Sequence, residues 1–431
     1  MAIKNRGLVL GATTLASVAL VVTGAGIHLS QGQAFFRESP KELIDEVWQL
    51  IDHEFVDDTF NAQDWQAVRT DYLNREYESS EDAYVAIREM LEQLDDPYTR
   101  FMDPQEFQNM QIDTSGELTG VGIQISQDED TDDIVVVSPI EQTPAFEAGV
   151  RSGDIIRAID GQSTEGMELN DAVNLIRGPV NSEVTLTLER EAEPMDFTLT
   201  RARIEIHPVR YTYETGEEGG VGYIRLTQFS ANASAEMREA IQELEDRDVT
   251  GYVLDLRSNP GGLLYSSIDI AQMWLNEGTI VSTVNRQGVV DENAASSNRS
   301  LTDKPVVVLV DGGSASASEI LSGALQDNDR AVLVGTKTFG KGLVQSVRGL
   351  ADGSGVAVTI AKYLTPSGRD INEYGIEPDF VVELSEEERE ALGSDREKIG
   401  TLEDPQYAKA LEVLSDMIRG ERESAALPSD F

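Results

Sequence analysis

The chain has 431 residues, enough for two or three domains with a sizeable hydrophobic core. Its 78 acidic residues outnumber 34 basic ones and leave a formal net charge of −44, which argues against nucleic acid and anionic membrane surfaces as partners. The absence of cysteine excludes disulfides, thiolate metal sites and a thiol nucleophile.

The N-terminal segment, residues 1–34, has the pattern of a secretory signal peptide or a single membrane anchor. Lys4 and Arg6 precede a charge-free run that continues to Phe36. The apolar part is long for a signal peptide and just long enough to span a bilayer. Gly32-Gln33-Ala34 offers a small-x-small cleavage site. In either case we expect the body of the protein outside the cytoplasm.

Residues 35–103 are predicted to form a helical domain. Ser39 and Pro40 fit the N-cap and first position of one helix, and a second helix is expected after Ser79 or Ser80. Apolar residues recur at three- and four-residue spacing in both stretches: Leu43, Val47, Leu50 and Ile51, then Tyr84, Ile87, Met90, Leu91 and Leu94. Such stripes are typical of residues that face a core.

Residues 104–203 change to short strands and turns, with strands expected at 120–124, 134–137 and 184–188. Together with the Ser-Gly-Asp-Ile-Ile sequence at 152–156, this stretch resembles a PDZ domain. The resemblance implies binding of a free C-terminus, in which the peptide adds a strand to a sheet edge and loop N–H groups hold its carboxylate. The matching loop is Gly120, Val121, Gly122 and Ile123. On their own, its glycines would indicate only a bend.

Residues 204–386 alternate between strands and helices. Strands are expected at 221–226, 251–256, 280–284, 305–310 and 331–334, helices at 234–244, 262–275 and 319–326, and a hairpin through 356–360. This alternation predicts a largely parallel sheet that meets ligands outside the carboxyl ends of its strands. The predicted fold class is therefore α+β / α/β multidomain. Residues 387–431 are expected to form an acidic helical tail.

The first turn at that edge of the sheet spans Asp255–Gly262 and ends in Asn-Pro-Gly-Gly. Two glycines allow main-chain N–H groups to point at an anion. A phosphate-binding loop is the competing interpretation, but the lysine and Ser/Thr of a Walker sequence are missing.

The second turn spans Asp311–Ile320, where an apolar strand leads into Gly-Gly, small residues and a helix start. Such a place suits a nucleophilic serine whose carbonyl target becomes an oxyanion. Spacing alone does not choose among Ser314, Ser316 and Ser318. Ser316 with Glu319 also matches a capping box, so the serine could instead only cap the helix.

A nucleophilic serine needs a base. None of the three histidines, His28, His53 and His207, lies near this turn in the sequence. Lys341 stands between glycines and apolar residues, and a dry setting there would lower its pKa. Gln345 shares its face four residues on and could hold it in place. The alternative is an ordinary solvated lysine in a glycine-rich loop.

The sequence Ser-Ala-Ser-Ala-Ser-Glu-Ile at 314–320, followed by Gly-Lys-Gly-x-x-Gln at 340–345, resembles the carboxyl-terminal processing proteases, also called tail-specific proteases. That family uses a Ser-Lys dyad whose serine precedes the lysine by 25 residues. The resemblance therefore implies Ser316 as nucleophile, Lys341 as base and Gln345 as the support of the lysine. It adds Asp327, eleven residues after the serine, as a further catalytic candidate.

The same resemblance implies an oxyanion hole made by the N–H groups of Ala317 and of Gly262 or Gly261, with Gly262 favoured. In some members, an arginine at the position of Arg177 couples the PDZ domain to the catalytic site. In some, the N-terminal helical domain supports a dimer. Its matching phrase is Leu94-Asp-Asp-Pro-Tyr-Thr-Arg-Phe101.

These features predict an extracytoplasmic serine endopeptidase that captures C-terminal tails of protein substrates and cleaves them without a metal or other cofactor. The alternatives are a non-catalytic PDZ scaffold on a hydrolase-like fold and a crotonase-like acyl-transfer enzyme. The wording of residues 39–61 resembles cyanobacterial members. That implies the periplasm or thylakoid lumen, and a photosystem II subunit precursor as one candidate substrate. A homodimer and N-terminal membrane anchoring are further expectations.

Overall fold

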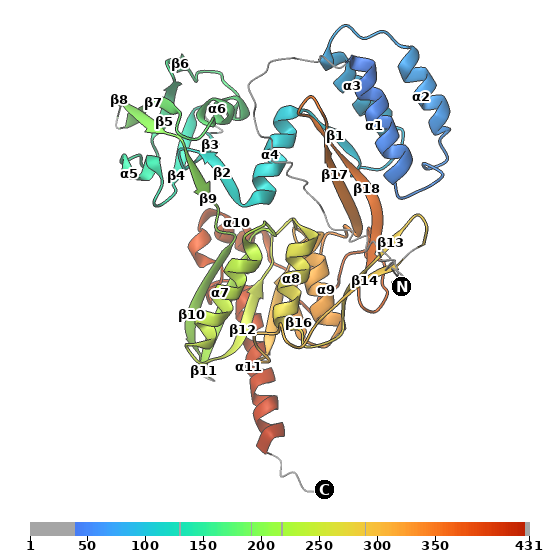
Figure 1. Cartoon of the computed structure of the whole chain (residues 1–431). Coiled ribbons are helices and arrows are strands. Elements are labelled where there is room, and N and C mark those ends of the chain that lie inside the picture. The colour runs from blue at the N-terminus through green and yellow to red at the C-terminus, as the bar shows by residue number, and fades with distance from the viewer. Residues whose placement is uncertain (1–38, 129–130, 191, 217–218, 289, 427–431) are drawn as a thin grey trace, which may run out of the picture.

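The computed structural model describes residues 39–128, 131–190, 192–216, 219–288 and 290–426. In Figure 1 the N-terminal helices and a small β-rich domain lie on the same side of a large α/β core. Helix α4 (Pro104–Ser115) and the hairpin β17 (Leu343–Gly349) and β18 (Gly355–Leu364) lie between them. The predicted signal or anchor, residues 1–34, falls outside the described residues. No described helix has an apolar stretch that could cross a bilayer.

The N-terminal unit has three helices: α1 (Pro40–Glu54), α2 (Trp65–Asn74) and α3 (Ser80–Glu92). Ser39 and Ser79 close capping boxes at the starts of α1 and α3, where the sequence predicts helix starts. The apolar stripes form one buried cluster that also contains Val356 and Val358 of β18. The helical unit therefore packs directly on the hairpin.

Strand β1 (Arg100–Met102) pairs antiparallel with β18. Just before it, the Thr99 hydroxyl accepts the main-chain N–H of Thr359 at 3.0 Å. An early segment of the chain thus runs along a strand from the second half of the sequence.

Helix α4 differs from the strands and turns predicted from residue 104 onward. Asp103 caps it in a capping box with Glu106, and Pro104 occupies its first position. The prediction of strands and turns for residues 104–115 was therefore wrong. The capping box and the proline, which are both present in the sequence, start a helix there.

The β-rich domain follows α4. Its elements are β2 (Glu117–Gly120), β3 (Ile123–Gln127), β4 (Ile134–Pro139), α5 (Pro144–Glu147), β5 (Ile155–Ile159), β6 (Gln162–Ser163), α6 (Leu169–Ile176), β7 (Glu183–Arg190), β8 (Glu193–Thr200) and β9 (Ala202–Glu205). The sheet has the order β3-β4-β5-β7-β8, with β6 on β5, while β2 pairs with β9. Its core is separate from the other clusters.

The large core follows the β-rich domain. Its remaining elements are β10 (Val209–Gly216), β11 (Gly219–Leu226), α7 (Ala233–Glu245), β12 (Val249–Asp255), α8 (Leu264–Trp274), β13 (Thr279–Asn285), β14 (Val290–Ala294), β15 (Val306–Val310), α9 (Ala317–Asp327), β16 (Ala331–Gly335), β19 (Phe380–Val381), α10 (Glu386–Ser394), the 3₁₀ turn Arg396–Lys398 and α11 (Pro405–Ala426).

The main sheet of this core has the order β10-β11-β12-β15-β16-β19 and is parallel from β11 onward. Helices α7, α8 and α9 cover one face, and α11 packs against the other. A second sheet joins β1, β18, β13 and β14, with β17 on β18. The carboxyl ends of β12 and β15 lie side by side, because these strands pair in parallel register.

Candidate active site

Two loops meet where β12 and β15 end. The Asn259 carbonyl, in the loop after β12, accepts the Ala315 N–H at 3.0 Å and the Ser318 hydroxyl at 2.9 Å. Asp311, just after β15, accepts the main-chain N–H of Ser258 at 2.8 Å. The Gly-Gly turn and the serine turn therefore form one hydrogen-bonded unit.

Ser316 lies between β15 and α9 in an unusual backbone conformation. Its φ of 54° and ψ of −111° differ from the β-region geometry of an ordinary N-cap. A positive φ at a residue with a side chain costs on the order of 1–3 kcal/mol and persists only where surrounding contacts enforce it. Glu319 does close the expected capping box onto the Ser316 N–H, and the backbone conformation favours a role for Ser316 beyond it.

Glu319 joins the serine turn to the lysine loop. Its carboxylate has no exposed surface and accepts the N–H groups of Ser316 at 2.8 Å, Lys341 at 2.9 Å and Gly340 at 2.7 Å. It also accepts the Thr338 hydroxyl at 2.6 Å. Four donors on one buried carboxylate fix the two loops relative to each other.

Tyr363 of β18 provides a second link between these loops. Its buried hydroxyl lies within hydrogen-bonding distance of the carbonyls of Ser316, at 3.1 Å, and Lys341. Glu319 and Tyr363 therefore contact the main chain at both candidate residues. In the sequence, Glu319 is visible only as part of a capping box and Tyr363 only as a strand residue.

The Lys341 side chain has neutral partners. Nζ donates to Gln345 Oε1 at 3.0 Å and lies 4.7 Å from the centre of the Tyr98 ring. Gln345 Nε2 in turn donates to the Tyr98 carbonyl. Gln345 therefore links the amine of Lys341 to the main chain of Tyr98, which lies in the segment before β1.

Burial lowers the pKa of Lys341, and the nearby charge of Arg100 lowers it further. The charges of Asp96 and Glu319 oppose this without reversing it. The lysine therefore loses its proton more readily than a solvated one, which is the property that a general base requires.

Ser316 and Lys341 line one cavity of about 220 Å³, together with Gly262 and Ala317. Among the described residues, no hydrogen bond joins the Ser316 hydroxyl to the lysine amine, which donates to Gln345 instead. The other walls are mostly apolar: Met102, Met110, Ile320, Leu343, Val344, Val347 and Ala357. The cavity suits a peptide segment with apolar side chains.

The two glycines proposed for the oxyanion hole differ in the hydrogen bonds of their N–H groups. The Gly261 N–H donates to Asn259 Oδ1 at 2.9 Å and is therefore occupied. The N–H groups of Gly262 and Ala317 have no acceptor in the part of the chain that the structure describes. Gly262 has a φ of 143°, and an added Cβ would lie 2.4 Å from the Phe229 carbonyl oxygen, so only glycine fits. This geometry favours Gly262 over Gly261.

Asp327 lies at the end of α9 opposite Ser316, about 16 Å along the helix axis. It accepts the Ser367 N–H at 3.0 Å and the Ser367 hydroxyl at 2.6 Å, and it pairs with Arg369. Burial raises its pKa, but these contacts outweigh burial and lower it overall. Asp327 thus anchors the loop after β18 and does not line the cavity.

The loop at Gly120–Ile123 joins β2 to β3 in the β-rich domain. Gly122 has a φ of 82°, and an added Cβ would lie 2.2 Å from the Thr143 hydroxyl oxygen. The Val121 and Gly122 N–H groups have no acceptor among the described residues. The loop therefore has the free amides that a peptide carboxylate needs.

Arg177 ends α6 and donates to Asn109 of α4. Met110 and Thr114 of the same helix line the cavity that contains Ser316. The structure thus joins the β-rich domain to the candidate active site through α4.

The comparisons with known proteins concern the family and the domains of the chain. The chain matches peptidase family S41 over residues 220–382 and a PDZ domain over residues 135–190. It is 46% identical over 414 residues to a carboxyl-terminal-processing protease of Synechocystis sp., covering 95% of each chain. It is 43% identical over 345 residues to chloroplastic carboxyl-terminal-processing peptidase 2 of Arabidopsis thaliana, covering 78% of this chain and 67% of the relative.

Among solved structures, the photosystem II D1 C-terminal processing protease aligns with a TM-score of 0.56 and 38% identity, covering 86% of this chain and 99% of that one. These similarities confirm the predicted family resemblance, the PDZ domain and the multidomain fold class. The chain belongs to peptidase family S41, among its carboxyl-terminal-processing proteases.

Proposed function

We propose that Ser316 and Lys341 form the catalytic dyad of this protease. The observation that supports this most is their common cavity, which Gly262 and Ala317 also line. Among the described residues, the N–H groups of these two have no acceptor and the half-buried lysine has no carboxylate partner. Glu319 binds the main chain at both residues. The nucleophile, base and oxyanion donors are thus held in one rigid unit.

In the proposed reaction, Ser316 Oγ gives its proton to neutral Lys341 Nζ while the oxygen attacks a peptide carbonyl carbon. The carbonyl oxygen becomes an oxyanion, which the Gly262 and Ala317 N–H groups stabilise. The protonated lysine then gives the proton to the leaving amine, so the C–N bond breaks and an acyl-enzyme remains. Lys341 next takes a proton from a water molecule, whose oxygen attacks the acyl carbon. The bond from that carbon to Ser316 Oγ then breaks, the lysine returns the proton to Oγ, and the free carboxylate product leaves.

The lysine has to exchange its bond with Gln345 for one with Ser316 when substrate binds. Both partners line the same cavity, and the proposal requires that a change of the lysine rotamer bring the amine to the serine. Catalytic hydrogen bonds are often absent or long before substrate binds. Gln345 and Asp327 then act as positioning residues, the first on the lysine and the second on the loop after β18.

The substrate in this proposal is a protein with an exposed C-terminal tail. Val121 and Gly122 donate to the tail carboxylate while the tail adds a strand beside β3. Arg177 transmits tail binding through Asn109 and α4 to the cavity. The D1 precursor is one candidate substrate, because a structural relative is a D1 C-terminal processing protease. Location in the periplasm or thylakoid lumen, N-terminal anchoring and a homodimer stay predictions.

The decisive experiment compares Ser316→Ala with the unchanged full-length chain on a tagged substrate with a free C-terminal tail. We expect cleavage to be lost, with unchanged circular dichroism and tail affinity, because the change removes only a hydroxyl. Residual activity close to that of the unchanged protein would overturn the dyad. Tail binding without cleavage by the unchanged protein, on several substrates, would instead favour the PDZ scaffold, and thioester hydrolysis would favour acyl transfer.

A further inference from the structure

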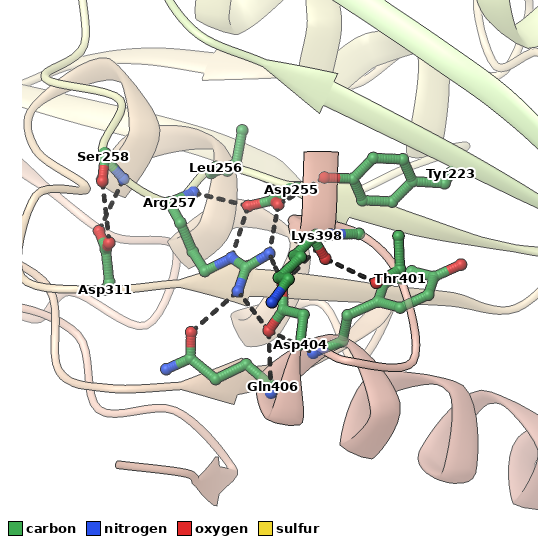
Figure 2. A network of polar contacts seen from close by, with 12 residues as sticks. Tyr223, Asp255, Leu256, Arg257, Ser258, Asp311, Lys398, Thr401, Asp404 and Gln406 are labelled. Atoms are coloured by element: carbon green, nitrogen blue, oxygen red, sulfur yellow. Dashed lines mark hydrogen bonds and ion pairs between the residues drawn. The ribbon is translucent and has the colours of Figure 1, made fainter. Parts of the chain in front are cut away.

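A buried network connects the C-terminal segment to the loop that carries Gly262. Figure 2 shows its centre, Arg257, between Asp255 and Asp404. The Arg257 side chain is 7% exposed and both carboxylates are fully buried. Arg257 lies two residues after the end of β12, and Asp404 directly precedes α11, so the network joins two distant parts of the sequence.

Every N–H group of the Arg257 guanidinium has a partner. Nε and Nη2 donate to Asp255 at 2.9 and 2.6 Å, and Nη1 and Nη2 donate to Asp404 at 3.0 and 2.7 Å. Nη1 also donates its second hydrogen to Gln406 Oε1, with an Nη1–Oε1 distance of 3.0 Å. Because the guanidinium is planar and rigid, two bidentate carboxylates fix its plane and the start of the loop behind it.

The carboxylates are held in turn by their surroundings. The Tyr223 hydroxyl donates to Asp255 at 2.7 Å. Asp404 accepts the main-chain N–H groups of Gly400 at 3.2 Å, Gln406 at 3.1 Å and Tyr407 at 3.2 Å. These contacts fix the Asp404 side chain relative to the start of α11.

On the other side of Arg257, the chain enters the strained loop. Ser258 has a φ of 57°, and its N–H and hydroxyl bind Asp311 at 2.8 and 3.2 Å, as Figure 2 also shows. Gly261 and Gly262 follow with φ values of 103° and 143°. Five residues after Arg257, Gly262 lines the cavity, and its N–H has no acceptor among the described residues.

Burial of three charges is a weak way to gain stability, because the desolvation cost offsets much of the attraction and apolar residues would often serve as well. Apolar residues in place of Arg257, Asp255 and Asp404 would not fix the direction in which the chain leaves β12. The contacts thus point to control of loop geometry.

We propose that Asp404 is a positioning residue for the oxyanion hole and that the segment 400–406 is needed for the full activity of the site. It acts by holding Arg257, which sets the course of residues 258–262 and hence the direction of the Gly262 N–H. This inference rests on the proposed role of Gly262.

The test uses Asp404→Asn and Asp404→Ala in the full-length protein, with a tail peptide as substrate. For both variants we expect kcat to fall about 10- to 100-fold with little change in KM, somewhat less than the loss of an oxyanion donor itself causes. Affinity for a peptide aldehyde, whose serine adduct places an oxyanion in the hole, should fall by a similar factor. Affinity for the tail peptide, measured in a Ser316→Ala background, should not change.

The matched control is Leu414→Ala, which leaves a cavity where α11 packs on the same face of the sheet. Leu414 lies in a buried apolar cluster that does not include Arg257. The substitution should lower the melting temperature but leave kcat of the folded protein and aldehyde affinity unchanged. Gln406→Ala, which removes only a neutral partner of Arg257, should give a smaller loss and covers the case in which the Asp404 variants do not fold.

Equal kcat in the Asp404 and Leu414 variants, after correction for the folded fraction, would overturn the proposal. So would unchanged aldehyde affinity in folded Gln406→Ala and Asp404→Asn. Either result would leave the dyad intact, since that proposal depends separately on the inactivity of Ser316→Ala.

Discussion

Two cations of the large core, the buried Arg257 and the half-buried Lys341, have opposite surroundings. Arg257 contacts two carboxylates within 3.0 Å, and they raise the pKa of its guanidinium although burial works against the charge. Lys341 contacts a neutral amide and an aromatic ring, forms no ion pair among the described residues, and has a lowered pKa. The difference separates a cation that holds a loop in place from one that is ready to give up its proton.

The largest expected effect comes from making Lys341 permanently charged. In Lys341→Arg, the guanidinium keeps its proton at every accessible pH, so the base is lost although the positive charge remains. We expect kcat/KM to fall about 10²- to 10⁴-fold at all pH values. Single-turnover assays from mildly acidic to alkaline pH check this. Recovery of activity at high pH would show that a neutral base is not required.

A carboxylate beside the lysine should give Lys341 the character of Arg257. In Gln345→Glu, the new charge stabilises the ammonium form, so we expect activity at pH 7 to fall on the order of tenfold or more and to return as the pH is raised. The unchanged enzyme should lose activity only at lower pH, where its lysine becomes protonated. The neutral control Gln345→Met removes the contact without adding charge, and its pH profile should not move toward alkaline values.

The smallest effect concerns the ring that covers the lysine. Tyr98→Ala admits water, and because burial is the largest cause of the lowered pKa, the pH profile should shift toward alkaline values. The lost contact between the ring and the amine, worth about 0.5–1 kcal/mol at an exposed site, acts in the opposite direction but is smaller. We expect a loss of a few-fold at pH 7. Tyr98→Phe keeps the ring and is the control; an equal shift in that variant would assign the effect to the hydroxyl.

The residues that sequence could identify are those inside continuous motifs. Gly261, Gly262, Ser316, Lys341 and Gln345 lie in short stretches whose turns and helix starts are encoded locally. Ser316 was separated from Ser314 and Ser318 only by family spacing, since a strand-turn-helix pattern does not specify which hydroxyl faces a cavity. The structure supports that choice, because Ser316 lines the cavity while Ser314 and Ser318 are fully buried.

Partners from distant segments could not be identified in this way. Tyr98 reaches the lysine because β1 pairs with β18, and Asp404 reaches Arg257 because α11 packs against β12 and β15. Neither pairing leaves a periodic signal in the chain. Tyr363 reads in the sequence only as one more apolar position of a strand. The helix at 104–115 is a different case, because its capping box, Asp103 with Glu106, is local and visible in the sequence.

Tyr98 and Asp404 lie far apart in the sequence, so the ribosome releases them at very different times during synthesis. Ribosomes release a chain from its N-terminus, and early domains fold while later ones are still being made. A nascent chain that has passed Lys341 but not residue 404 contains serine and lysine without the helix that holds Arg257. On the roles proposed for these residues, peptide hydrolysis reaches its full rate only when translation is almost complete, so an unfinished molecule cuts itself or its neighbours more slowly than the finished protein would.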